Sequence, residues 1–161
     1  MRRVMQGNRS SETTPEVALR SELHRRGLRF RKHRQAIPEL RCRADIVFSK
    51  ATVAVFVDGC FWHRCPEHLT DPRTNSAYWA AKLDRNIARD RRNDAALEAK
   101  GWCVVRVWEH ESASDAADRV EAALAERQMR PGRTLGQRLE SRGHARQPEG
   151  GHVAPQAAEL V

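Results

Sequence analysis

Residues 52–58 read Thr-Val-Ala-Val-Phe-Val-Asp, an unbroken run of β-branched and apolar side chains that ends on a carboxylate. A strand that is apolar on both faces lies in the interior of a sheet that is covered on both sides. Residues 44–48, Ala-Asp-Ile-Val-Phe, have a similar character and precede it across a short turn at Ser49-Lys50. The two segments therefore predict a hairpin, with its second strand central in the sheet.

Helices and further strands are expected on either side of this hairpin. Thr14-Pro15-Glu16 supplies the hydroxyl, proline and acid of a helix start, and the helix should run to Arg26 and stop at Gly27. We expect a half-exposed strand over 28–33, a charged helix over 78–100, another central strand over 102–109, and a last helix from Ser114 or Asp115 to about Arg127. The side chains expected in the core are Val17, Leu19 and Leu23, then Trp79, Leu83, Ile87 and Leu97, and finally Val120, Ala123 and Leu124. This order predicts an α/β sandwich around a mixed sheet.

The length of 161 residues allows one domain with its own core. We assign that domain to residues 1–127 and expect residues 128–161, rich in Gly, Pro, Gln and Arg, to be a disordered tail. No apolar run is long enough to span a membrane, and the opening residues lack a signal-peptide core, so a cytoplasmic protein is expected.

The net charge of +8 suits a polyanion as partner, although a basic surface can equally serve solubility. The same choice arises in the helix expected over 78–100. Its arginines, Arg85, Arg89, Arg91 and Arg92, could contact phosphate or could pair with Asp84, Asp90 and Asp94 on a solvated face.

A candidate metal centre lies in the irregular segment 59–75. Cys60, Cys65 and His68 form C-x4-C-x2-H, and His110 follows the last expected strand. Four N/S ligands from separate short segments are typical of structural zinc, with no open coordination position. His63 competes for the same metal, and a reactive-thiol loop with incidental histidines is the alternative.

A second constellation is suited to phosphodiester hydrolysis. Asp45 opens one strand of the hairpin and Asp58 closes the other, so the two carboxylates should be neighbours and suit a hard cation such as Mg²⁺. His63 lies five residues after Asp58, and Glu16 lies on the first helical turn. A cation to stabilise phosphorane charge and a histidine to accept a proton from water are the minimum for this reaction. Spacing alone is weak support, since an aspartate at a strand end is more often a cap or a solubilising residue.

Four segments together resemble the very short patch repair (Vsr) mismatch endonucleases. They are MQGNRSSETTPE (5–16), VAVFVDGCFWHRCPEH (53–68), TNSAYWAAKLDRNIARDRRND (74–94) and GWCVVRVWEHE (101–111). The similarity runs in register from Met5 to Glu111. It implies a restriction-endonuclease-like three-layer α/β sandwich with a structural zinc site. It also implies a bacterial, nucleoid-associated, Mg²⁺-dependent enzyme that nicks one DNA strand beside a T:G mismatch.

The resemblance also assigns roles to individual residues. Asp45 and the backbone carbonyl of Val57 match the magnesium ligands, His63 the general base, and Glu16 the acid that orients it. Met5, Phe61 and Trp62 match side chains that wedge into the DNA, with residues 1–13 as a DNA-contacting arm. A packed core under the zinc loop is the alternative for Phe61 and Trp62. The zinc positions match Cys60, Cys65, His68 and His110, which leaves His63 for catalysis.

Two departures from the family pattern affect the active site. Some members have histidine where this chain has Asp58, so Asp58 could be a direct magnesium ligand here. Restriction-type sites usually carry a lysine two residues after the second acid, and Cys60 occupies that place.

Three functions compete. They are a strand-specific mismatch nickase acting as a monomer on double-stranded DNA alongside other mismatch-repair proteins, a restriction-like endonuclease on matched sites, and a non-catalytic zinc module that binds DNA. A zinc deaminase is excluded, because its H-x-E and P-C-x-x-C pattern is missing.

Overall fold

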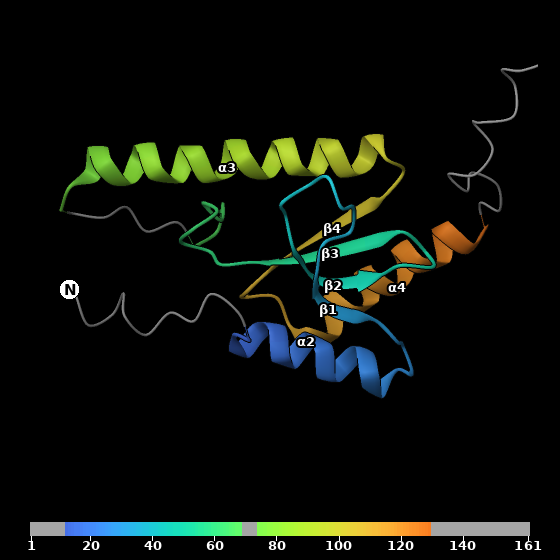
Figure 1. Ribbon diagram of the computed structural model, residues 1–161. Helices are drawn as coiled ribbons and strands as arrows, with labels where there is room; N and C mark the ends of the chain where they lie inside the picture. The colour runs from blue at the N-terminus through green and yellow to red at the C-terminus, as the bar shows by residue number, and fades with distance from the viewer. Residues whose placement is uncertain (1–11, 69–73, 130–161) are drawn as a thin grey trace, which may run out of the picture. The chain divides into compact units, whose positions relative to one another are not determined.

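The computed structural model describes residues 12–68 and 74–129. Their order is helix, three strands, helix, strand, helix, as the sequence predicts (Figure 1). The elements are α2 (Thr14–Arg25), β1 (Arg31–Arg34), β2 (Ala44–Phe48), β3 (Val53–Asp58), α3 (Ser76–Ala99), β4 (Cys103–Trp108) and α4 (Ala113–Met129).

The strands form one mixed sheet in the order β1-β2-β3-β4. β1, β2 and β3 are antiparallel neighbours, and β3 and β4 are parallel. The hairpin and the interior position of β3 are confirmed. The expectation that the last strand is also central is wrong for the described residues, because β4 lies at the end of the sheet. Its burial alternates, with Val105 and Val107 buried between half-buried neighbours, as in a strand with one fully covered face.

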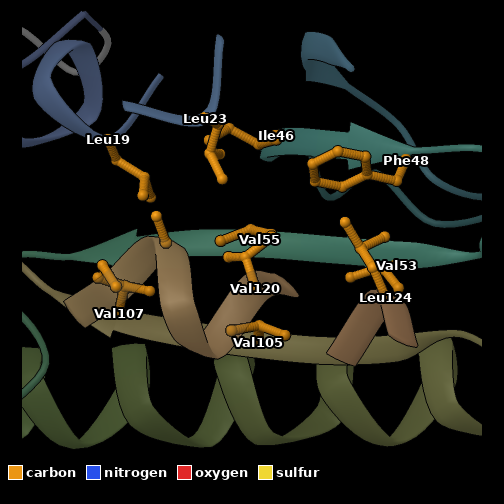
Figure 2. Packing of buried hydrophobic residues seen from close by; sticks show 12 residues of the cluster. Leu19, Leu23, Ile46, Phe48, Val53, Val55, Val105, Val107, Val120 and Leu124 are labelled. Atoms are coloured by element: carbon orange, nitrogen blue, oxygen red, sulfur yellow. The ribbon is translucent and has the colours of Figure 1, made fainter. Parts of the chain in front are cut away.

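Helices cover both faces of the sheet, which makes three layers (Figure 1). On one face, α2 and α4 pack over residues of β2, β3 and β4, and Leu19, Leu23, Val120 and Leu124 meet the strands there (Figure 2). On the other face, α3 contributes Leu97 to a smaller cluster with Ala54 and Phe56. The three-layer α/β arrangement with a mixed sheet is therefore confirmed.

Several local expectations need correction. Val17 is 44% exposed and does not face the core, and Trp79 and Ile87 are only half-buried. The last helix starts earlier than expected, because the hydroxyl of Ser112 accepts a hydrogen bond from the backbone of Asp115 (3.1 Å) and caps it. The first strand is shorter than expected and shifted to Arg31–Arg34, where it pairs with β2.

Some expectations fall on residues outside the described part of the chain. They are the DNA contact of the arm up to residue 11, the position of Met5, and the tail from residue 130 onward. Among the described helices, none combines the length and apolar character that crossing a membrane requires.

Candidate functional site

Three elements bring polar side chains together around Asp45, on β2. The backbone amide of Val57, on the neighbouring β3, donates a hydrogen bond to Asp45 Oδ2 (2.8 Å). Glu16 reaches the same place from α2, and His33 reaches it from β1. One ligand atom from each of Glu16, His33 and Asp45 lies within 4.8 Å of the others. The sequence interpretation had placed Asp45 and Glu16 in the site but had missed His33.

Arg20 offsets part of the negative charge of this cluster, since its Nη1 lies 3.5 Å from Glu16 Oε2. Burial raises the pKa of Asp45 to about 6, against the hydrogen bond from Val57 and with a smaller contribution from the negative charge of Glu16. Glu16 is only 4% exposed and accepts hydrogen bonds from the Glu12 amide (2.9 Å) and the Thr13 hydroxyl (3.0 Å). Two close carboxylates and an imidazole can hold a divalent cation, whose charge would offset their repulsion.

His63 is held by Asp90, a residue that the sequence interpretation had not selected. His63 Nδ1 lies 2.7 Å from Asp90 Oδ2, on α3. Although burial raises the pKa of Asp90, its hydrogen bond and charge interaction with His63 lower it below the ordinary value. A carboxylate on Nδ1 fixes the ring orientation and leaves Nε2 able to accept a proton. The resemblance gave the task of orienting His63 to Glu16, but the described hydrogen bonds give it to Asp90.

Asp58 is engaged by an arginine. Both of its carboxylate oxygens accept hydrogen bonds from Arg106 Nη1 at 2.8 Å, and Asp94 on α3 binds the same guanidinium (2.8 Å). Asp58 is 5% exposed, and its Oδ1 lies 3.7 Å from His63 Nδ1. This geometry makes Asp58 the buried partner of Arg106 rather than a member of the Asp45 cluster. A central arginine in the apolar strand 103–108 could have signalled such a pair.

The four residues expected to bind zinc come together. One ligand atom from each of Cys60, Cys65, His68 and His110 lies within 4.8 Å of the others. His110 Nδ1 lies 3.1 Å from Cys60 Sγ and 3.6 Å from Cys65 Sγ. Two thiols and two imidazoles at this separation fit one tetrahedral ion of the zinc type. His63 is not part of this group and contacts Asp90 instead.

Loss of this cluster is expected to destabilise the whole domain. Cys60→Ala removes a ligand that links the loop to the end of β4, and metal bound at such a site contributes directly to folding. We expect a loss of several kcal/mol, measured by denaturant unfolding alongside the metal content per chain. Cys42→Ala, which changes a half-buried thiol outside the cluster, is the control. Wild-type stability after complete metal removal would contradict the prediction.

Aromatic side chains gather where the Cys/His loop meets the start of α3. The rings of Phe61 and Trp62 lie 5.5 Å and 6.0 Å from that of Trp79, and the ring of Tyr78 lies 5.5 Å from that of Trp79. Lys82 Nζ lies 5.3 Å from the centre of the Trp62 ring and 5.1 Å from that of Trp79. Phe61 and Trp62 are half-buried, and Tyr78 is 57% exposed. We call these four aromatic residues and the lysine the aromatic cluster.

The charged residues of α3 fit both alternatives, ion pairing within the protein and exposure to a phosphate. Its aspartates do not pair only along the helix: Asp84 binds Arg64 (2.9 Å), Asp90 binds His63, and Asp94 binds Arg106. Arg89 contacts Asp90 (3.1 Å), as a solvated face would require. All four arginines named in the sequence interpretation are exposed.

A carboxylate cluster that could hold a divalent cation and a histidine held by a carboxylate are groups suited to phosphodiester hydrolysis. Comparison with known proteins agrees. A family model described as DNA mismatch endonuclease Vsr matches residues 1–67. The chain is 50% identical over 124 residues to the Type II nicking enzyme V.NaeI of Lentzea aerocolonigenes, covering 76% of this chain and 75% of that one.

Two further relatives extend the comparison. The Type II nicking enzyme V.XorIIP of Xanthomonas oryzae pv. oryzae is 45% identical over 111 residues, covering 68% of this chain and 79% of the relative. The DNA mismatch endonuclease Vsr of Escherichia coli is 36% identical over 99 residues, covering 61% and 62%. The chain belongs to the Vsr family of DNA endonucleases. Membership implies the restriction-endonuclease-like fold, which the three layers fit.

Proposed function

We propose that this endonuclease nicks one strand of double-stranded DNA beside a T:G mismatch. The observation that carries the proposal is the placement of two chemically distinct sites on one domain. One is the Asp45 cluster with the His63–Asp90 pair, which suits hydrolysis. The other is the aromatic cluster, which suits unstacked bases. Relatives named as nicking enzymes support cleavage of one strand, and a relative named as a mismatch endonuclease supports action at a mismatch.

The proposed chemistry divides between two groups. Asp45 and the Val57 carbonyl would hold Mg²⁺, with Asp58 kept outside by Arg106. A divalent cation there stabilises the charge that develops on the scissile phosphate. His63, oriented by Asp90, accepts the proton of the attacking water at Nε2. The Cys/His cluster, which we assign to Zn²⁺, fixes the loop that carries His63 and the two aromatic residues before it.

The aromatic cluster provides a physical basis for mismatch preference. Inserting an apolar side chain between base steps costs a few kcal/mol of unstacking, and the cost is lowest where pairing is already faulty. Half-buried rings supported by Trp79 are well placed to make such an insertion without losing their own packing. A lysine held over these rings adds positive charge for the DNA backbone.

Cleavage of two duplexes that differ in one base tests the function. The wild-type protein is mixed with T:G and C:G duplexes of the same sequence, at one salt concentration and with Mg²⁺. A mismatch nickase cuts the T:G duplex faster, a restriction-like enzyme cuts both alike, and a binding module cuts neither. Equal rates, or binding with no cleavage, would each overturn the proposal.

Trp62→Ala should weaken binding and reduce the preference for the T:G duplex. Stacking of a base on an aromatic ring is worth about 1–3 kcal/mol, so a loss of roughly five- to 150-fold in affinity is expected. Residual nicking should persist at high enzyme concentration, because Asp45 and His63 are untouched. Fluorescence anisotropy gives the affinities, and single-turnover nicking gives the preference.

Trp102→Ala is the matched control, since it removes a half-buried tryptophan that packs on the α3 face of the sheet, outside the aromatic cluster. It should lower stability without changing the T:G preference. Wild-type affinity and discrimination in Trp62→Ala would instead mean that the ring serves only to pack the loop.

A further inference from the structure

His33 is the one residue of β1 that is not exposed. The strand reads Arg-Lys-His-Arg, and only its histidine is half-buried. The register pairs Lys32 with Ile46 and Arg34 with Ala44, which sets His33 opposite Asp45. Residues directly opposite on antiparallel strands interact through their side chains. The sheet therefore presents this imidazole to the Asp45 carboxylate.

The backbone of His33 is adapted to this placement. Its φ of 48° lies in the left-handed region, which side chains rarely adopt, although His, Asn and Asp tolerate it best. Such strained residues concentrate at ligand-binding and catalytic sites, where the surrounding structure holds them. In this short strand of otherwise exposed basic residues, the left-handed backbone of His33 helps to place its side chain.

The two ring nitrogens of His33 face different carboxylates. Nδ1 lies 3.9 Å from Asp45 Oδ1, and Nε2 lies 3.7 Å from Glu16 Oε2. Both separations exceed a hydrogen bond. The separation of 3.9 Å is, however, shorter than twice the metal–ligand distance of about 2.1 Å, so one cation can contact both Nδ1 and Oδ1. Histidines that bind a metal commonly donate their other N–H to a carboxylate, which is where Glu16 lies.

We propose that His33 Nδ1 is a direct ligand of the divalent cation held by Asp45, with Glu16 as the acceptor for the Nε2 proton. The inference rests on the proposed function, which places the cation at Asp45. A nitrogen ligand in an oxygen site favours transition-metal ions relative to Mg²⁺, which prefers oxygen. The site should therefore bind Mn²⁺ with a nitrogen ligand that an all-oxygen magnesium site lacks.

Arg20 lies beside both His33 and Glu16. Its Nη1 lies 3.2 Å from His33 Nε2 and 3.5 Å from Glu16 Oε2. With a cation on Nδ1, the one ring proton of a neutral imidazole would be on Nε2, which would then donate to Glu16. Arg20 would retain its contact with Glu16 in that arrangement.

Mn²⁺ binding to the full chain tests this assignment without an activity assay. Mn²⁺ alone is added to protein whose Cys/His cluster is saturated with Zn²⁺, free Mn²⁺ is counted by EPR, and bound Mn²⁺ is probed by pulsed EPR for coupling to nitrogen. His33→Asn removes the ring and tolerates the left-handed backbone, and His33→Gly is a second variant without that restriction. His24→Asn, on an exposed histidine of α2, is the matched control, and ¹⁵N-histidine labelling assigns the coupled nitrogen.

We expect nitrogen coupling in the wild type and in His24→Asn, and none in either folded His33 variant. Mn²⁺ affinity should fall about 10- to 100-fold in those variants, and Mg²⁺ affinity should fall less. Asp45→Asn distinguishes a failure of this inference from a failure of the proposed cation site. If Mn²⁺ binding requires Asp45 but shows no His33 nitrogen, this inference is wrong and the proposed cation site stands. If Mn²⁺ binds equally well without Asp45, the proposed cation site itself is wrong.

Discussion

Asp45→Asn is expected to abolish Mg²⁺-dependent cleavage and to leave binding to a T:G duplex within about threefold of wild type. The Asp45 carboxylate is the charged ligand of the proposed cation, while recognition rests on the aromatic cluster and on phosphate contacts. The amide oxygen of asparagine can still accept the hydrogen bond from Val57, so the hairpin should be kept. Single-turnover nicking and fluorescence anisotropy on the same duplex measure the two effects separately.

The pH dependence of the free energy of unfolding provides a second test of the role of Asp45. The pKa of Asp45 lies near 6, above the value of 3.8 for a free aspartate, so in the metal-free protein the ionised carboxylate opposes folding. That cost appears as the pH rises above about 4 and reaches its full value, of the order of 2–3 kcal/mol, above pH 6. Metal-free Asp45→Asn should therefore be at least as stable as the wild type at pH 7.5, and the advantage should vanish near pH 4.

The same carboxylate sets a pH dependence for activity. Below about pH 6 the metal-free Asp45 carboxyl becomes protonated, so cation affinity and cleavage should fall together as the pH drops. Raising the Mg²⁺ concentration should restore part of the activity. Asp118→Asn, which alters an exposed carboxylate paired with Arg26, is the control and should cleave normally. Normal cleavage by Asp45→Asn would place the active site elsewhere.

His63→Ala is expected to slow single-turnover cleavage by about 10² to 10⁴, the usual contribution of a positioned general base. Asp90→Asn should also slow it, by about 10² or more, because an amide on Nδ1 no longer selects the tautomer with Nε2 free. Neither change removes a group from the Asp45 cluster, so cation affinity should stay within about threefold of wild type. Nicking rates across pH, together with Mn²⁺ titration, provide the measurement.

Asp84→Asn is the matched control for Asp90→Asn. It changes an aspartate of the same helix that is 62% exposed and paired with Arg64. Its rate should equal that of the wild type. If Asp90→Asn also cleaved at the wild-type rate, the His63–Asp90 pair would be a structural contact with no part in proton transfer.

The elements and the Cys/His cluster were predictable because their signals are local. The apolar, β-branched run 52–58 is short and follows a turn, which favours a covered strand, and the spacing of Cys60, Cys65 and His68 limits them to one loop. His110 joins them because β4 lies parallel to β3, which brings the ends of the two strands together. That parallel pairing follows from the helix between the strands.

The rest of the site depends on contacts that the sequence does not encode locally. His33 belongs to a strand that reads as basic and exposed, and only its register with β2 and its left-handed backbone direct it to Asp45. Asp90 stands among many charged residues of α3, and the docking of that helix decides which of them faces His63. Arg106 binds Asp58 because β3 and β4 are neighbours in the sheet, and no spacing rule predicts that pairing.

Strand-resolved cleavage of a single mismatch tests the central claim most directly. A duplex with one T:G pair carries a different dye on each strand and is mixed with excess wild-type protein and Mg²⁺, alongside the C:G duplex and Asp45→Asn. We predict one product, from one strand, adjacent to the mismatch, with much slower cleavage of the C:G duplex and none by the variant. Cleavage of both strands, or equal rates on the T:G and C:G duplexes, would contradict it.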